Sequence, residues 1–446
     1  MSRYSIALVF MFSVLGCKKE NLIQPEIIVP LKATSLSGYS LTSNDYLVIN
    51  NLKSIANNFS DSKPLSPQNE FDNLSTLINT TQIVGMGEAT HGTHEFFEMK
   101  HRLFRWLVQK HQFKAIAFES SWGYGLYVDR YVTEGIGNES TAMRKLQFGV
   151  WQTEEVRELI RWMKEYNSGK SQSDKIHFYG TDCQAWYDEI SLVNGYMDKV
   201  DQKYKNTVNN VLKPLYDMDV VPEYRNKSQI YQATVSQNLD EIYTTFKANK
   251  IEYVSKSSEN EFAMALQALR VIIQCEKFGS QQGSRDRFMA ENTEWIMNYS
   301  GGDKKIAVWA HNAHVSQIYE RQGYFLKKKF KKAYQIFGFS LGKGDFSVRS
   351  YKYNNFQDEP NQKLPTMSYG SYNQIFLDSN IGNFYIKLSE IPADSPFEYW
   401  MQNSPKFFTA GALYDESNPF YENIIINKVY DVIFHFDNTK GSVAIR

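Results

Sequence analysis

The stretch Gly87-Glu88-Ala89-Thr90-His91-Gly92-Thr93-His94-Glu95 lies between two segments of different hydrophobic pattern. The apolar run Ile83-Val84-Gly85-Met86 precedes it and is typical of a buried strand. After it, the spacing of apolar residues predicts an amphipathic helix from residue 95 to about residue 108. We therefore expect the carboxylate of Glu88 and the imidazole of His91 in a turn at the carboxyl end of a strand. Open α/β sheets place their ligand sites at such ends.

Four apolar runs of this kind are followed by polar or small residues, and helical segments separate the first three. They are residues 82–88, 113–120, 175–182 and 305–312. Strands that alternate with helices in this way are joined by right-handed crossovers and form a largely parallel sheet. The sequence therefore predicts an α/β fold with a central, largely parallel sheet flanked by helices.

The rest of the chain departs from this alternation in two places. Between residues 182 and 305 only helical patterns are found, the clearest at 228–249 and 260–278, so we expect a helical lobe over about residues 190–300, inserted between two strands. After His314 the chain becomes rich in strand patterns. We expect strands at residues 334–341, 383–388, 407–414 and 429–436, and a loop at the polar residues 351–370.

Composition limits the classes of partner. Of the 446 residues, 42% are hydrophobic, which is enough for a large core. Lys and Arg together number 49, as do Asp and Glu, and the only basic block is at residues 327–332. This balance argues against nucleic acid as a partner.

Polar side chains follow each of the four core strands. Since parallel strands end at one edge of a sheet, we expect these groups to converge into one polar site. The groups are Glu88 and His91 on the first strand, Glu119 and Ser120 on the second, Asp182 and Gln184 on the third, and His311, Asn312 and His314 on the fourth.

Two cations are further candidates. Lys100 falls on the apolar face of the predicted helix with Phe96 and Leu103, so it either meets a buried carboxylate or extends outward to water. Arg285 begins another predicted helix just before the strand that ends at His311. It either clamps an anion or forms a surface salt bridge.

Several of these motifs resemble those of the erythromycin esterase family over roughly residues 80 to 320. They are Gly87-Glu88-Ala89-Thr90-His91-Gly92 with Glu95-Phe96-Phe97, Lys100-His101-Arg102-Leu103, Phe118-Glu119-Ser120, Gly180-Thr181-Asp182-Cys183-Gln184, Arg285-Asp286 with Met289-Ala290-Glu291-Asn292, and Ala310-His311-Asn312-Ala313-His314.

The resemblance implies a hydrolase that needs no metal or other cofactor, opens the lactone ester of 14-membered macrolides such as erythromycin, and so confers resistance. It implies that His91 is the general base that activates water. Glu88, Glu119, Arg285 and His311 would support it, and Lys100 lies where the family has a basic residue. We also expect four residues to contact the substrate, namely Asp182, Gln184, His314 and Trp122.

Ester hydrolysis requires these types of residue. A histidine titrates near neutral pH, and a carboxylate, either Glu88 or Glu119, would fix its tautomer. The tetrahedral intermediate needs a donor, for which Arg285 and Lys100 are candidates. No Gly-x-Ser-x-Gly motif is present, so a serine nucleophile has little support, and Ser120 is the nearest candidate.

Two other classes of function remain open from the sequence. His91-x-x-His94 and His311-x-x-His314, together with Glu88, are chemically adequate ligands for zinc, which would make the protein a metal-dependent hydrolase of another ester. The chain could also be a binding lipoprotein without catalytic activity.

The first residues predict export and lipidation. Arg3 precedes an apolar run at residues 6–15 that is too short to span a bilayer, and Val14-Leu15-Gly16-Cys17 resembles a bacterial lipobox. We expect residues 1–16 to be a lipoprotein signal peptide, 17–45 a membrane tether and 46–446 the catalytic domain. An ordinary secretory signal is the alternative. Cys183 and Cys275 then remain, and a disulfide between them stays open.

If Cys17 carries the lipid, the full-length chain expressed in a bacterial host should partition with membranes, on the periplasmic side or in the cell envelope. Cys17→Ser should release the protein or stall its processing. Firm attachment requires more than one acyl chain, because a single chain binds membranes only marginally. Membrane fractionation of the two proteins tests this, and a wild-type chain found only in the soluble fraction would contradict it.

Overall fold

The computed structural model describes residues 35–445 apart from 222, 300–304, 353–354, 404, 412 and 416–419. The predicted signal peptide, the lipidation site at Cys17 and the first part of the predicted tether lie outside the described residues. Among the helices described, none is both long and apolar enough to cross a membrane.

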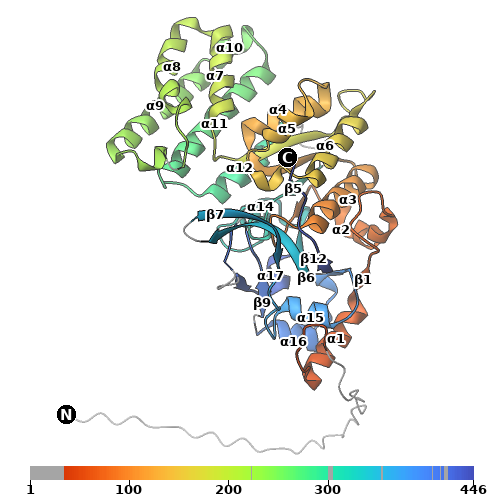
Figure 1. The fold of residues 1–446 in the computed structure, drawn as a ribbon. Coiled ribbons are helices and arrows are strands. Elements are labelled where there is room, and N and C mark those ends of the chain that lie inside the picture. The colour runs from red at the N-terminus through yellow and green to blue at the C-terminus, as the bar shows by residue number, and fades with distance from the viewer. Residues whose placement is uncertain are drawn as a thin grey trace, which may run out of the picture.

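A mixed, mostly parallel sheet forms the centre of the molecule (Figure 1), which confirms the predicted fold class. Its main path runs β1-β8-β12-β6-β2-β5-β3-β4, with β7 and β10 paired to β6 off the path. The strands are β1 Asn57–Asn58, β2 Ile83–Met86, β3 Phe113–Ser121, β4 His177–Asp182, β5 Lys305–Trp309, β6 Tyr334–Lys352, β7 Asn355–Lys363, β8 Phe384–Lys387, β10 Leu413–Tyr414 and β12 Val432–Thr439. The five strands from β6 to β4 on this path are parallel to one another, so the four runs read from the sequence end at one edge.

Alternation along the strands divides the core between the two faces of the sheet. In β5, Ala307 and Trp309 pack on one face while Ile306 and Val308 pack on the other, as a period of two requires. The first face is covered by α2 Ser75–Ile78, α3 His94–His111, α4 Trp122–Glu134, α5 Glu139–Arg144 and α6 Glu154–Asn167. The second face is covered by α1 Ser43–Ile55, α12 Arg285–Tyr299, α14 Gln322–Phe330, α15 Tyr372–Asp378, α16 Pro396–Met401 and α17 Ile426–Val429.

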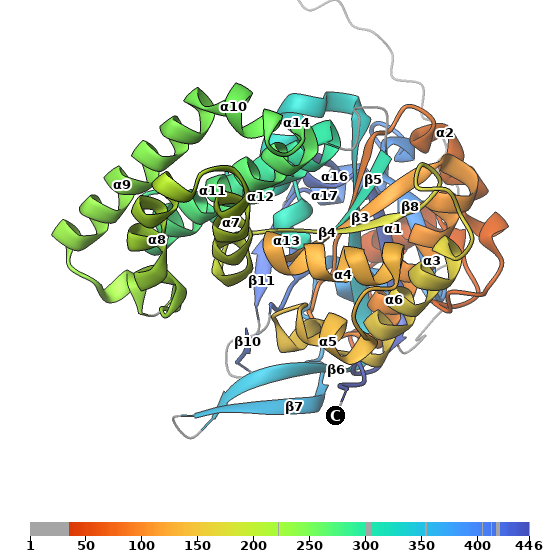
Figure 2. The same ribbon diagram turned by 90° about the horizontal axis from the view of Figure 1, so that it is seen from above.

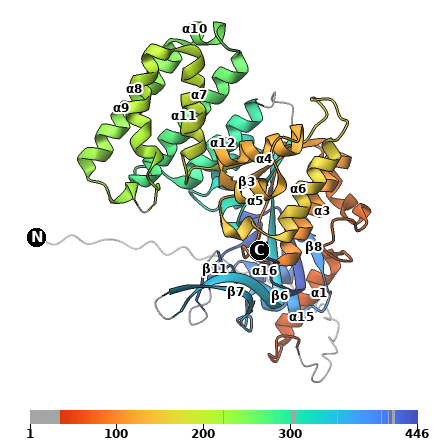
Figure 3. The ribbon, with the colours of Figure 1, turned by 45° about the horizontal axis from the view of Figure 1, so that its top comes forward.

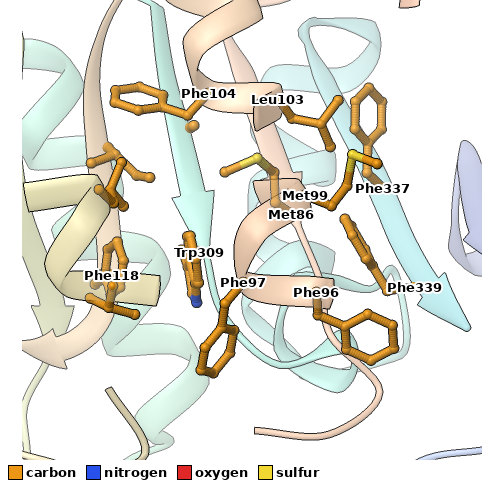
Figure 4. Packing of buried hydrophobic residues seen from close by; sticks show 14 of the residues in the cluster. Met86, Phe96, Phe97, Met99, Leu103, Phe104, Phe118, Trp309, Phe337 and Phe339 are labelled. Carbon is orange, nitrogen blue, oxygen red and sulfur yellow. The ribbon is translucent and has the colours of Figure 1, made fainter. Parts of the chain in front are cut away.

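Helix α3 holds residues 87–93, the turn that carries His91, against the first face of the sheet. Phe96 and Phe97 stand in its first turn and pack against Phe339 and Trp309 of neighbouring strands (Figure 4). Aromatic contacts of this kind add to the stabilisation from burial alone. The helix ends at Gln112, which adopts the left-handed conformation. The turn before α3 is therefore held between a strand and a rigidly packed helix.

The predicted helical lobe is present between β4 and β5. It consists mainly of α7 Tyr187–Val200, α8 Gln202–Tyr216, α9 Gln229–Ala248, α10 Lys250–Ser255 and α11 Glu259–Gly279, with a core of its own. Figures 1 and 2 show this group of helices beside the sheet and its covering helices rather than over a face of the sheet. The lobe is joined to the site through α12, whose first residue is Arg285.

Two predictions for the strand-rich part are wrong. Residues 351–370, expected to be a loop, contain β7, which pairs antiparallel with β6 in a hairpin that extends from the body (Figure 2). The pairing depends on backbone hydrogen bonds, so a polar strand of this kind leaves no hydrophobic pattern. The strand expected at 407–414 is two short strands, β9 Lys406–Phe408 and β10. The first pairs with β11 Tyr421–Asn423 outside the main sheet.

Asn312, the first residue of α13 Asn312–Val315, fixes the edge of the sheet where the site forms. Its buried side chain donates to the carbonyl oxygen of Phe339 at 2.8 Å and accepts the Phe339 N–H at 3.0 Å. Its own N–H donates to the carbonyl oxygen of Glu88 at 2.9 Å. A Cβ on Gly87 would lie 2.1 Å from the Asn312 Oδ1, which explains why residue 87 is a glycine.

Replacement of this amide should therefore destabilise the fold. Asn312→Leu has a similar size but leaves the buried N–H and C=O of Phe339 without partners, at about 1–3 kcal/mol for each group. We expect a loss of about 2–4 kcal/mol in the free energy of unfolding, measured by urea denaturation. Asn51→Leu, on the partly exposed surface of α1, is the control and should change stability far less. An Asn312→Leu protein as stable as the control would show that the amide does not hold this edge.

Candidate active site

Glu88 links a histidine and a lysine in the turn after β2. Its Oε1 lies 2.5 Å from the His91 Nδ1, and its Oε2 lies 2.5 Å from the Lys100 Nζ. Glu88 and Lys100 are fully buried, whereas the side chain of His91 is 11% exposed. The carboxylate thus holds the proton of His91 on Nδ1 and leaves Nε2 with a free electron pair. Of the two carboxylates considered from the sequence, Glu88 is the one that orients His91.

Of the two alternatives considered from the sequence, Lys100 meets a buried carboxylate. It contacts Glu88 on the side away from the cavity. Its Nζ lies 4.5 Å from the centre of the Trp309 ring and 3.4 Å from the carbonyl oxygen of Ala310. Burial lowers the pKa of Lys100 to about 8, although the charge of Glu88 acts in the opposite direction. Because its side chain is fully buried behind Glu88, Lys100 does not reach the cavity. The oxyanion contact considered for it is therefore wrong.

His311 stands beside His91, with 5.0 Å between the ring centres. Its Nδ1 accepts the N–H of Ala313 at 3.3 Å, and its Nε2 lies 3.2 Å from the Thr409 Oγ1. Nδ1 is thus an acceptor, and the proton sits on Nε2 and points to Thr409. Burial and the neighbouring histidines lower the pKa of His311 well below its usual range, so it is a neutral ring.

Arg285, Glu119 and Asp182 form the second part of the site. The Arg285 guanidinium donates to both oxygens of Asp182, at 3.0 and 2.7 Å, and to the Glu119 Oε1 at 2.8 Å. The Glu119 Oε2 accepts the backbone N–H of His311 at 3.0 Å. Burial acts to raise the pKa of Glu119, but the charges of His314 and Arg285 hold it well below the usual range. Arg285 is therefore a partly buried clamp between two carboxylates and not a surface salt bridge.

His314 adds a second cation to this network. Its Nδ1 lies 2.6 Å from the Asp286 Oδ1, and its Nε2 lies 3.3 Å from the Glu119 Oε1. Burial opposes the charged ring, yet the two carboxylates raise the pKa of His314 to about 9. His314 is thus a cation near neutral pH.

A cavity of about 620 Å³ opens between these two parts of the site. Five of the predicted site residues line it, namely His91, Glu119, Gln184, Arg285 and His314. Asp182 lies behind them, where it accepts from Gln184 at 2.7 Å and from Arg285. Each of the four strands therefore contributes at least one of its predicted groups to the cavity lining, and an imidazole with a free Nε2 shares the cavity with two cations.

Two sequence candidates do not reach the cavity. Trp122, expected to contact the substrate, is fully buried, packs at 5.5 Å against Trp295 and belongs to the core of the helical lobe. Ser120 is also fully buried and does not line the cavity, so it offers no nucleophile there. Both residues lie near the end of β3, where sequence position alone does not tell which side chains face the opening. Cys183 and Cys275, for which a disulfide was left open, are free and buried.

The residues considered as zinc ligands do not all point toward one position. His94 turns away from His91 and pairs with Glu155 at 2.6 Å. His314 is engaged by Asp286 and Glu119. Across the part of the chain that the structure describes, no three His, Cys, Asp or Glu side chains are grouped so that they could hold a metal ion.

Several residues of the site were missed in the sequence. Thr409 contacts His311 from 98 residues further along the chain, and Trp151 packs edge-on against His91 at 5.2 Å while its Nε1 donates to the carbonyl oxygen of Glu119. Residues 442, 444 and 445 also line the cavity. None of these lies at the end of a core strand, which was the signal that located the others.

Comparison with known proteins extends the resemblance to most of the chain. The erythromycin esterase family model matches residues 108–439. The type II erythromycin esterase of Escherichia coli is 21% identical over 417 residues, which cover 84% of this chain and 94% of that protein. A solved structure from Bacillus cereus has a TM-score of 0.81 at 24% identity, over 91% of this chain and 100% of the other. An erythromycin esterase mutant, EreC, solved in its open conformation, has a TM-score of 0.66 at 16% identity, over 84% and 96%. Since the family model covers well over half of the sequence, this chain belongs to the erythromycin esterase family and is a hydrolase.

Proposed function

We propose that this protein hydrolyses the lactone ester of 14-membered macrolides such as erythromycin and thereby confers resistance to them. The observation that carries the proposal is the pair of Glu88 and His91, whose 2.5 Å contact leaves the His91 Nε2 free at the cavity. The E. coli relative that aligns with 84% of this chain at 21% identity is an erythromycin esterase, and this supports the choice of substrate.

In the proposed reaction, His91 acts as general base. Its Nε2 takes a proton from a water molecule as the water oxygen attacks the lactone carbonyl carbon. The Glu88 carboxylate stabilises the resulting imidazolium through Nδ1, and Lys100 holds Glu88 in place. When the ring carbon–oxygen bond breaks, the imidazolium returns the proton to the alkoxide, and the product is an open-chain hydroxy acid.

The cations on the opposite wall stabilise the negative charge that develops on the carbonyl oxygen. Arg285 and His314 both line the cavity, and both are fixed by carboxylates before substrate binds. Charges held in this way need little rearrangement during the reaction, which is the basis of strong electrostatic catalysis. The neutral His311 fixes the position of this wall relative to His91.

The test is mass spectrometry of erythromycin after incubation with the purified protein, which should show the gain of one water. His91→Asn should lower the rate by at least about a hundredfold, the usual scale for removal of a general base, without loss of folding. His177→Asn is the matched control, because His177 lies at the start of β4, at the opposite edge of the sheet, and its rate should equal that of the wild type. An unchanged rate in His91→Asn would remove His91 from the mechanism, and intact erythromycin with wild-type protein would refute the proposed substrate.

The metal-dependent alternative makes the opposite prediction for chelation. Since the proposed base and cations are all side chains, the rate of erythromycin hydrolysis should survive exhaustive treatment with EDTA and 1,10-phenanthroline. A zinc hydrolase treated in parallel serves as control. Loss of activity that only added zinc restores, with one zinc bound per chain, would favour the metal-dependent reaction. A third class, a binding lipoprotein without catalysis, would bind erythromycin and return it unchanged.

We further propose that the protein acts outside the cytoplasm as a lipoprotein anchored at Cys17. The support is Arg3, the short apolar run and the lipobox-like residues 14–17. A macrolide would then be opened before it reaches its intracellular target.

A further inference from the structure

The cavity has two chemically different halves. The catalytic half carries His91, His314, Glu119 and Arg285. The other half is mostly apolar, and its lining includes Phe148, Val150, Trp151, Val348, Ala444 and Ile445. Apolar linings with a few convergent polar groups are typical of small-molecule sites. The second half is therefore suited to a bulky, apolar part of a ligand, and its shape depends on residues far apart in the sequence.

Residues 440–445, which we name the closing segment, run across the turn that carries His91. The Ser442 N–H donates to the carbonyl oxygen of Gly92 at 2.9 Å, and the His94 N–H donates to the carbonyl oxygen of Lys440 at 2.9 Å. In Figure 2 the mark C, where the segment ends, lies beside the β6–β7 hairpin, and in Figure 3 it lies next to α5 and α6. The segment thus bridges the catalytic turn and the helices of the first face.

The backbone of the closing segment also forms hydrogen bonds with residues at the start of α6 and just before it. The Glu154 N–H donates to the carbonyl oxygen of Val443 at 2.8 Å, and the Ile445 N–H donates to that of Gln152 at 2.9 Å. The Glu155 carboxylate accepts the N–H of Val443 at 3.1 Å. His94 holds that carboxylate at 2.6 Å, and hydrogen bonds to Glu155 and Glu98 raise the pKa of His94 to about 10. The closing segment is therefore attached by its backbone, and its side chains are free to serve another purpose.

The side chains of the closing segment differ in whether they reach the cavity. Ser442, Ala444 and Ile445 line the cavity, whereas Val443 does not and is 53% exposed. Ala444 has a small side chain, lines the cavity and is itself exposed to solvent. No catalytic contact described above involves the side chain of Ala444 or Ile445.

We propose that the closing segment determines substrate size, with Ala444 and Ile445 as the wall that accepts the bulky apolar body of the ester. The inference rests on the proposed function for the chemistry at His91 but concerns the apolar part of the cavity lining. The small side chain at 444 leaves room for a large ring, and a larger side chain there would remove that room. Because the closing segment is held through its backbone, a larger side chain at residue 444 would leave the turn that carries His91 in place.

The test is to measure the affinity for erythromycin by isothermal titration calorimetry with the full-length His91→Asn protein, in which the ligand stays intact. Addition of Ala444→Trp should weaken binding at least about tenfold, the scale on which a filled apolar pocket discriminates. Ala444→Leu should have an intermediate effect and guards against misfolding of the larger variant. Val443→Trp is the matched control, since it adds the same side chain at the neighbouring residue, which does not line the cavity, and its affinity should be unchanged.

Equal affinities of Ala444→Trp and the parent, equal losses in Ala444→Trp and Val443→Trp, or no binding to the parent would each overturn the inference. Failure of the proposed function has a different signature. In that case the wild type would bind erythromycin with the same dependence on residue 444 but would not add water to it.

Discussion

The site depends on one buried carboxylate that serves two partners. Glu88 has no exposure to water, so its charge needs compensation within the protein, which Lys100 supplies at one oxygen and His91 at the other. Removal of Lys100 would leave a buried charge with only a histidine to balance it. The orientation of His91, the position of the turn and the packing of α3 beneath it all follow from this arrangement.

A second balance of charges stands across the cavity. Arg285 and His314 are surrounded by the carboxylates of Glu119, Asp182 and Asp286. Since each cation is hydrogen-bonded to a fixed carboxylate, neither is free to swing away when substrate is absent. The helical lobe enters the chemistry here, because α12 carries both Arg285 and Asp286. The lobe is thereby tied to the sheet edge by the same ions that line the cavity.

The sequence predicted the parts of this structure that have a local signal. Buried parallel strands are short apolar runs, and polar residues at their carboxyl ends predicted that Glu88, His91, Glu119 and His314 would lie close together. Arg285 was predicted from the start of a helix instead. Local pattern does not tell which way a side chain turns after its strand, and Trp122 was misplaced for this reason. Nor does it reveal contacts between distant segments. The hydroxyl of Thr409 and the backbone of residues 440–445 reach the site only because the whole sheet is assembled.

The carbonyl oxygen of Gly92 shows what that assembly means for folding. It accepts one N–H from Ser347 of β6 and another from Ser442, residues separated from it by more than half of the chain. Contacts of such long range form late and slowly, because the loops between them must close first. The turn that carries His91 is therefore among the earliest parts of the chain to be synthesised and among the last to be completed. A chain that emerges across a membrane in sequence order would remain catalytically silent until its final strand and the closing segment have docked.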